Sequence, residues 1–163
     1  MSTTRAALTP FAAEPGASNF PQLLTINSRP ALAFDAATKE TAYWTLVAPQ
    51  GLTGTMTLVL TYMMASATSG TIELEVAVEA VSDGDSTDLD AGTSFDTANA
   101  SGAITVPGTA GYPDQVSITL TTQDAVAAGD YLRLSIARDA ADGTNDTATG
   151  DLYLLLAELR DAA

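Results

Sequence analysis

Alternating apolar and polar side chains are clearest between Gly54 and Val81. From Thr71 to Val81 nearly every second side chain is apolar, and three of the positions between them are glutamates. From Gly54 to Ala65 the same period sets Met56, Leu58, Leu60 and Tyr62 against threonines. A period of two is typical of a strand whose sheet has one buried and one exposed face. The stretch therefore predicts two long strands, which either pair as a hairpin or lie in opposite sheets with their apolar faces meeting in the core.

Further short stretches of strand character lie on both sides of this pair. They are residues 31–34, 41–47, 103–106, 115–121, 131–138 and 151–160. The last of them is apolar on both faces, which favours a central strand or one covered by a partner. About eight strands separated by turn signals predict an all-β fold, namely an antiparallel β-sandwich of jelly-roll type.

The N-terminal segment has a different character. Four prolines punctuate residues 1 to about 30, and no helical or strand period runs through them. We expect an extended N-terminal arm over residues 1–28, followed by the sandwich domain over residues 29–163. The arm lies either on its own domain or on a neighbouring subunit, with apolar side chains as anchors. These candidate anchors are Phe11, Phe20, Leu23, Leu24 and Ile26.

Charge and composition narrow the function further. The net charge of −14 and the pI of about 4.1 argue against nucleic acid and against an anionic membrane surface as partners. No stretch is apolar enough over the length that a membrane span needs. Because the sequence contains no cysteine and no histidine, it excludes disulfides, thiolate metal sites and catalysis by Ser-His-Asp or Cys-His sets.

Two acidic loops have side chains suited to calcium. Asp83, Asp85, Asp88 and Asp90 lie in a polar stretch after the second long strand, and calcium takes six to eight oxygen ligands. Their spacing departs from the EF-hand pattern, so a solvated acidic turn is the alternative interpretation. A second loop, residues 139–146, has a similar character, and in a sandwich the two loops can fall at one end.

Other candidate side chains have structural interpretations. Glu73, Glu75 and Glu79 share one face of a strand, and we interpret them as the wet face of a sheet and not as a catalytic carboxylate pair. Trp44 follows Tyr43 on a short strand, where a core tryptophan is favoured over a platform for stacking a sugar. No set of residues indicates catalysis, so we expect the protein not to be an enzyme.

The C-terminal half carries a series of short elements with a family resemblance. The series consists of Ala110-Gly111, Ile118-Thr-Leu120, Ala128-Gly-Asp130, Leu132-Arg-Leu134, Arg138-Asp139 and Asn145-Asp146. Together with the sandwich layout, it resembles small virion structural proteins of tailed phages and related viruses, among them jelly-roll decoration (cement) proteins.

The resemblance implies a structural role in a virion. A decoration protein of this kind binds the major capsid protein as a homotrimer on the capsid surface, and it stabilises the shell, often through an extended N-terminal arm. The alternative hypothesis is a receptor-binding or carbohydrate-binding module of a tail or fibre, assisted by calcium. That alternative requires exposed aromatic side chains and a metal cage.

Overall fold

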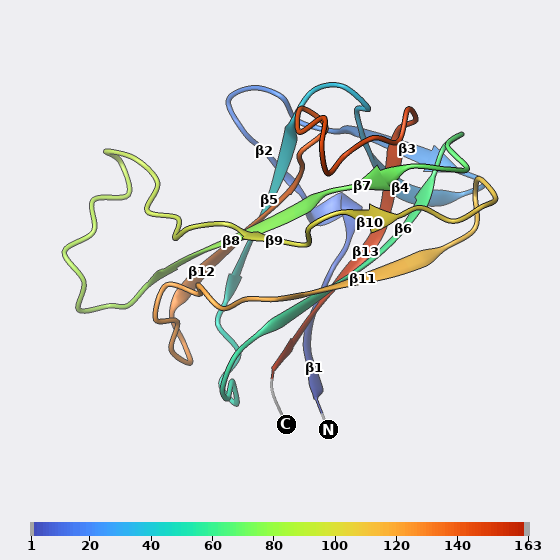
Figure 1. Ribbon diagram of the computed structural model, residues 1–163. Coiled ribbons are helices and arrows are strands. Elements are labelled where there is room, and N and C mark those ends of the chain that lie inside the picture. The colour runs from blue at the N-terminus through green and yellow to red at the C-terminus, as the bar shows by residue number, and fades with distance from the viewer. Residues whose placement is uncertain (1, 162–163) are drawn as a thin grey trace.

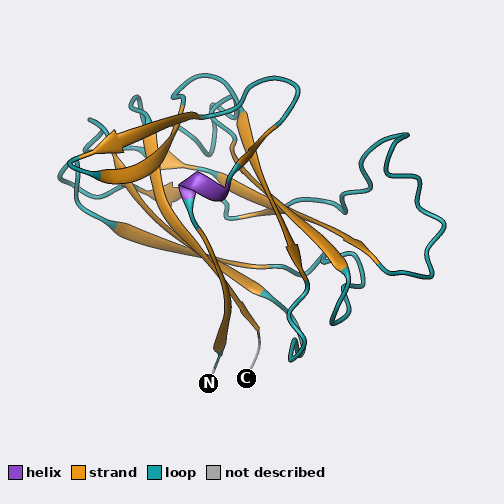
Figure 2. Ribbon diagram, turned by 180° about the vertical axis from the view of Figure 1, so that it is seen from behind, coloured by secondary structure: helices purple, strands orange, loops and turns teal. Residues whose placement is uncertain are grey.

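The chain folds into two antiparallel β-sheets that pack face to face (Figures 1 and 2). The computed structural model describes residues 2–161. The one helix among them is a single 3-10 turn, η1 (Pro10–Ala12), and no helix in this range is long and apolar enough to cross a membrane. The strands are β1 (Thr3–Leu8), β2 (Glu14–Pro15), β3 (Gln22–Ile26), β4 (Arg29–Phe34), β5 (Glu40–Val47), β6 (Thr57–Met64), β7 (Thr71–Ile72), β8 (Leu74–Val81), β9 (Asn99–Ala100), β10 (Ile104–Thr105), β11 (Asp114–Thr119), β12 (Tyr131–Arg138) and β13 (Leu152–Asp161).

The order of the strands is that of a sandwich with frequent crossings between layers. One sheet has the order β11-β6-β13-β4-β3, and β1 pairs with the part of β13 that β4 does not reach. The other sheet has the order β2-β5-β12-β8-β9, and β7 and β10 form a separate short pair. From β5 to β13 the long strands alternate between the two sheets, as in a jelly roll. The predicted all-β sandwich is therefore confirmed.

The two strands of residues 54–81 lie on opposite sides of the core. Strand β6 pairs with β11 and β13, whereas β8 pairs with β12 and β9, so the hairpin alternative is wrong and the opposite-sheet alternative is right. Their alternating apolar side chains meet between the layers, where Leu58, Leu60, Val76 and Val78 are each 3% exposed or less. Trp44 joins this core and donates from Nε1 to the carbonyl of Thr9 at 2.9 Å, as expected of a core tryptophan.

A β-bulge explains why the last strand is apolar on both faces. The pairing of β13 with β6 shifts between Leu154 and Leu156. Before the shift the even-numbered Leu152 and Leu154 are buried, and after it the odd-numbered Ala157 and Leu159 are buried. One extra residue thus changes which side chains face the core. Strand β13 is central, with β6 on one side and β4 and β1 on the other, as its sequence predicts.

The N-terminal segment differs from the expected separate arm. It is extended, but β1 pairs with β13, β2 pairs with β5, and β3 pairs with β4, so residues 3–26 contribute strands to both sheets. The boundary expected between residues 28 and 29 falls inside the turn that joins β3 to β4. The prolines interrupt the segment, so its strands are short. Short strands at a sheet edge bury few side chains, and for this reason the sequence shows no alternation of apolar and polar residues there. The segment lies on its own domain.

Glu75 and Glu79 of β8, together with Glu73 just before it, do not form a solvent-exposed face of the sheet. Glu79 does point away from the core, yet it is 1% exposed, because the returning end of the loop of residues 82–98 lies over it and Ser94 there donates to its carboxylate. Arg133 of the neighbouring strand pairs with the same carboxylate at 3.1 Å. Glu73 is also buried, and Glu75 pairs with Lys39. The alternation predicted which way these side chains point but not what covers them.

Candidate functional site

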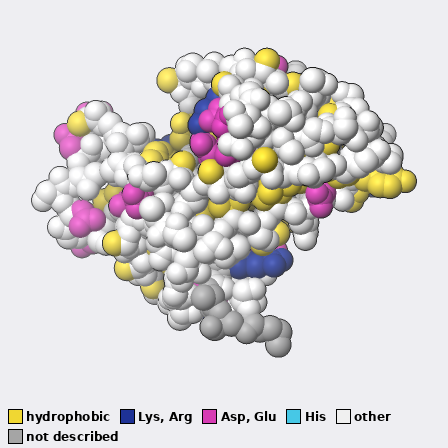
Figure 3. Space-filling model, viewed as in Figure 1, with side chains coloured by type: hydrophobic (Ala, Val, Ile, Leu, Met, Phe, Trp, Pro, Cys, Tyr) yellow, Lys and Arg dark blue, Asp and Glu magenta, His cyan; other side chains and the backbone are white. Residues whose placement is uncertain are grey.

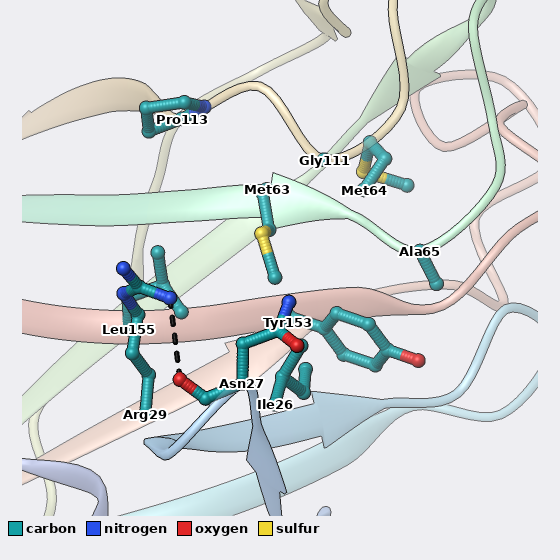
Figure 4. Close-up of a pocket in the computed structure, with 10 residues that line it drawn as sticks. All are labelled: Ile26, Asn27, Arg29, Met63, Met64, Ala65, Gly111, Pro113, Tyr153 and Leu155. Carbon is teal, nitrogen blue, oxygen red and sulfur yellow. Dashed lines mark hydrogen bonds between the residues drawn. The ribbon is translucent and has the colours of Figure 1, made fainter.

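A groove of about 490 Å³ lies over the outer face of the six-stranded sheet. Four segments form it: the β3–β4 turn, the end of β6, the loop before β11, and β13 (Figure 4). Its walls are mostly apolar, and its volume is within the range of roughly 300–1,000 Å³ that is typical of small-ligand sites. The residues that line it are Ile26, Asn27, Arg29, Met63, Met64, Ala65, Gly111, Pro113, Tyr153 and Leu155.

A tight hairpin turn positions the polar side of the groove. Ile26 pairs with Arg29, which leaves Asn27 and Ser28 as a two-residue loop, and both have positive φ (47° and 66°). Positive φ at both loop residues is the type I′ geometry, whose twist matches that of antiparallel strands. Asparagine tolerates this conformation better than most residues. The turn therefore presents Asn27 and Arg29 side by side at the rim.

The apolar floor follows from strand pairing and from the bulge. Met63 of β6 and Tyr153 of β13 are directly opposite partners in the ladder, so their side chains lie on the same face. Leu155 lies two residues after Tyr153, so strand alternation puts it on the same face, and it lines the groove as well. Figure 4 shows Met63 and the Asn27 amide between the Arg29 guanidinium and the Tyr153 ring. A flat aromatic surface and planar hydrogen-bonding groups thus share one cavity.

The electrostatic character of the groove is set by Arg29. Its side chain is exposed, and its Nη1 donates to the Asn27 carbonyl at 3.3 Å. None of the ten lining residues is acidic. The nearby Asp114 already accepts a hydrogen bond from the Tyr62 hydroxyl at 3.1 Å, and burial, followed by this carboxylate, raises the pKa of Tyr62. The groove therefore offers donors without a competing carboxylate on its walls.

The predicted calcium residues are not brought together. Asp83, Asp85, Asp88 and Asp90 are exposed on the loop of residues 82–98, which projects from the sandwich at the left of Figure 1 and carries acidic side chains in Figure 3. Asp85 accepts from the Ser82 amide at 2.9 Å, and Asp88 accepts from the Asp90 amide at 3.1 Å. Within residues 2–161 no group of three or more acidic side chains is arranged to hold a metal ion. The carboxylates of Asp85 and Asp88 instead stabilise turns of their own loop.

The second acidic loop has a structural role at the opposite end of its sheet. In the β8–β12 ladder Val81 lies beside Tyr131, whereas Arg138 lies beside Leu74, so the loops that follow Val81 and Arg138 leave opposite ends. The two loops therefore do not combine into one cage. Asp146 pairs with the buried Arg138 at 2.8 Å, and burial raises the pKa of Glu73, whose carboxylate faces this loop.

The candidate anchors of the N-terminal segment are distributed over different surroundings. Phe20 packs against the core, Phe11 is 70% exposed in η1, and Leu23 is 44% exposed on β3. Leu24 is partly buried on β3, and Ile26 lines the groove. They do not form one apolar surface, and only Ile26 belongs to the candidate site.

Most of the groove was not predicted from the sequence. Tyr153 is the one aromatic residue on a strand that is apolar on both faces, and Asn27-Ser28 is a turn signal, but neither points to a shared cavity. Their proximity depends on which strands pair. Trp44, the tryptophan considered as a sugar platform, is 2% exposed and takes no part.

Comparisons with known proteins identify the fold and no family. No protein-family model and no curated protein matches the sequence. Among solved structures, the Agl-KA catalytic domain aligns over 99% of this chain and 28% of its own length, with 12% identity and a TM-score of 0.52. A Paenibacillus sp. cycloisomaltooligosaccharide glucanotransferase, complexed with cycloisomaltoheptaose, aligns over 94% of this chain, with 12% identity and a TM-score of 0.50. The chain spans only 18% of that enzyme's length.

A carbohydrate-binding module from Cellvibrio mixtus lichenase 5A, in complex with cellotriose, has a TM-score of 0.49 and 10% identity, and it aligns over 99% of this chain and 100% of its own. Likeness at such low identity concerns the fold alone. The two enzyme structures, with TM-scores of 0.50 and 0.52, support the β-sandwich part of the expected resemblance. They give no support to its assignment to virion proteins.

Proposed function

We propose that this domain is a carbohydrate-binding module that holds a saccharide in the groove beside Tyr153. The observation that carries the proposal is the composition of that groove, where an aromatic ring and the Met63 side chain adjoin the planar polar groups of Asn27 and Arg29. A pyranose ring has an apolar C–H face and hydroxyl groups around its edge. An aromatic surface suits the face, and amide and guanidinium groups suit neighbouring hydroxyls.

The fold is compatible with this role. The same sandwich is found in an enzyme whose crystals contain cycloisomaltoheptaose, although at 12% identity that likeness supplies no residue of the site. The groove has the size of a small-ligand site and is open to solvent along the sheet, which suits a short segment of a glycan chain. We propose a binding role without catalysis, because the groove walls carry no carboxylate, thiol or imidazole.

The capsid-decoration hypothesis relied on a free arm that grips a neighbouring subunit. The strands within residues 3–26 pair within the domain's own sheets, so these residues do not form a free arm that could bind a neighbouring subunit. Binding to a major capsid protein as a homotrimer stays a prediction from the resemblance.

The test is binding to a glycan array, followed by titration calorimetry with the best ligand. We expect Tyr153→Ala to weaken that binding at least about tenfold, which corresponds to about 1.4 kcal/mol. Tyr131→Ala is the matched control, because Tyr131 is an exposed tyrosine on the outer face of the other sheet (40% exposed). Equal affinity of Tyr153→Ala and wild type would refute the location of the site, and failure to bind any glycan would refute the function.

A further inference from the structure

Nearly all basic side chains of this acidic protein are neutralised within the domain. The sequence has six lysine and arginine residues against 20 acidic ones. Five of the six lie within 4.0 Å of a carboxylate, and over residues 2–161 Arg29 is the basic side chain that makes no ion pair. The ion pairs are Arg5–Asp161, Lys39 with Glu75 and Asp139, Arg133–Glu79, Arg138–Asp146, and Arg160–Glu158.

The unpaired cation lies at the rim of the groove and not at a random surface position. Arg29 is the first residue of β4, immediately after the tight turn, and one of its N–H groups is engaged with the Asn27 carbonyl. A guanidinium has five N–H donors in a planar fork, so four remain to bind a ligand. The hydrogen bond from Nη1 to the turn restrains one arm of the fork, which lowers the entropy lost when a ligand binds.

Charge around the groove favours one anion at this place and disfavours anions elsewhere. The groove walls contain no acidic residue, and Asp114 beside them is bonded to Tyr62. The protein as a whole, Arg29 included, carries a net charge of −14. At 0.1 M salt, charges interact over about 10 Å, so an anionic group near Arg29 is attracted while further anions on the same ligand meet a repelling surface.

Resting on the proposed carbohydrate-binding function, we infer that the groove selects a saccharide with an acidic substituent, a carboxylate or a sulfate ester, which the Arg29 fork binds while Tyr153 packs on the sugar ring. Both groups present paired oxygens that match a guanidinium bidentately. Because the surrounding body is acidic, the preferred ligand carries such groups sparsely, and a polymer with an acid on every ring binds more weakly than a neutral chain with isolated acidic branches.

The experiment compares matched ligands on the full chain. Glucuronoxylan is paired with unsubstituted xylan, a sulfated galactan with agarose, and polygalacturonate serves as the densely charged arm. We expect about tenfold tighter binding to a sparsely acidic member than to its neutral partner, and we expect this preference to shrink as NaCl rises from 50 to 500 mM. The carboxylate and sulfate pairs show which of the two groups is preferred.

Two arginine variants locate the effect. Arg29→Gln should weaken binding to the acidic ligand more than binding to its neutral partner and so remove the preference between them, and Arg29→Lys should restore only part of that preference because the fork is lost. Arg160→Gln is the control, because it removes one positive charge from β13 of the same sheet, outside the groove. A preference that survives Arg29→Gln, or is lost equally in Arg160→Gln, would overturn the inference. Binding to neutral glycans alone would overturn it and leave the proposed function intact, whereas binding to no glycan would overturn both.

Discussion

The buried ion pair between Arg138 and Asp146 allows a quantitative test of how the β12–β13 connection is stabilised. Both Asp146 oxygens are within 2.8 Å of Arg138 nitrogens, and the side chains are 0% and 1% exposed. The guanidinium also donates to the carbonyl groups of Ala148 and Gly150 at 3.0 and 2.7 Å. Asp146 in turn accepts from the Glu73 amide at 3.2 Å. The arginine therefore fastens the loop onto the end of its own strand.

Removing either partner leaves the other charge buried without compensation. Such a loss costs about 3–5 kcal/mol, a large share of the roughly 5–15 kcal/mol by which domains are stable. Arg138→Met and Asp146→Leu should each lower the free energy of unfolding by that amount. The double variant buries no charge and leaves one amide and two carbonyl groups without these partners, at about 1 kcal/mol each. We expect it to lose about 3 kcal/mol in total and not the sum of the single losses.

Equilibrium urea unfolding, followed by the fluorescence of the single tryptophan in the core, measures all four proteins. The coupling energy from the double-mutant cycle should be about 3 kcal/mol. Gln22→Ala, at an exposed position on β3, is the control and should stay within about 0.5 kcal/mol of wild type. Additive single losses, or single losses below about 1 kcal/mol, would refute the reasoning that desolvated charge dominates this site.

Two further predictions concern the N- and C-terminal strands. A hydrogen bond from Arg5 is the largest cause that holds the pKa of Asp161 at about 2, below the usual 3.8, so the folded state favours the ionised form. This contribution to stability is present above pH 4 and is lost as pH falls toward 2. In Asp161→Asn the unfolding midpoint should therefore change less between pH 4 and pH 2 than it does in the wild type. An unchanged slope would contradict the role given to the Asp161 carboxylate. Deletion of residues 1–8 removes β1 from β13 together with the buried Leu8, and we expect a loss of about 2–4 kcal/mol in urea unfolding. An unchanged midpoint would show that β1 contributes nothing to the fold.

The sequence predicts the long strands because each has one face in the core. The alternation of Leu132, Leu134 and Ile136 with more polar residues fits a strand and not a helix, and β12 covers these residues. Pairing is harder to predict, because the same apolar face serves a hairpin or a sandwich. Glu79 shows a second limit, since its direction follows from the period but its burial depends on a loop that folds back over the sheet.

The groove depends on contacts between distant parts of the chain. Arg29 and Tyr153 belong to strands that become neighbours only because β13 inserts between β4 and β6. The bulge in β13 decides which later side chains face the core, and a run of four consecutive apolar residues, 154–157, does not indicate where an extra residue will be accommodated. The groove is assembled from distant segments, so no local sequence motif marks it. The acidic loop of residues 82–98 has a sequence that resembles a metal-binding motif, but its side chains do not come together into a site.

The central place of β13 also determines when the domain can fold during synthesis. Three strands, β1, β4 and β6, pair with it along one edge or the other, and among the strands of this domain it comes last in the chain. Until β13 is synthesised, β6 and β4 each have an open edge, and β1 has no partner for its backbone groups. The six-stranded sheet can therefore close only in a late step, because its central contacts join β13 to strands from the start and the middle of the domain.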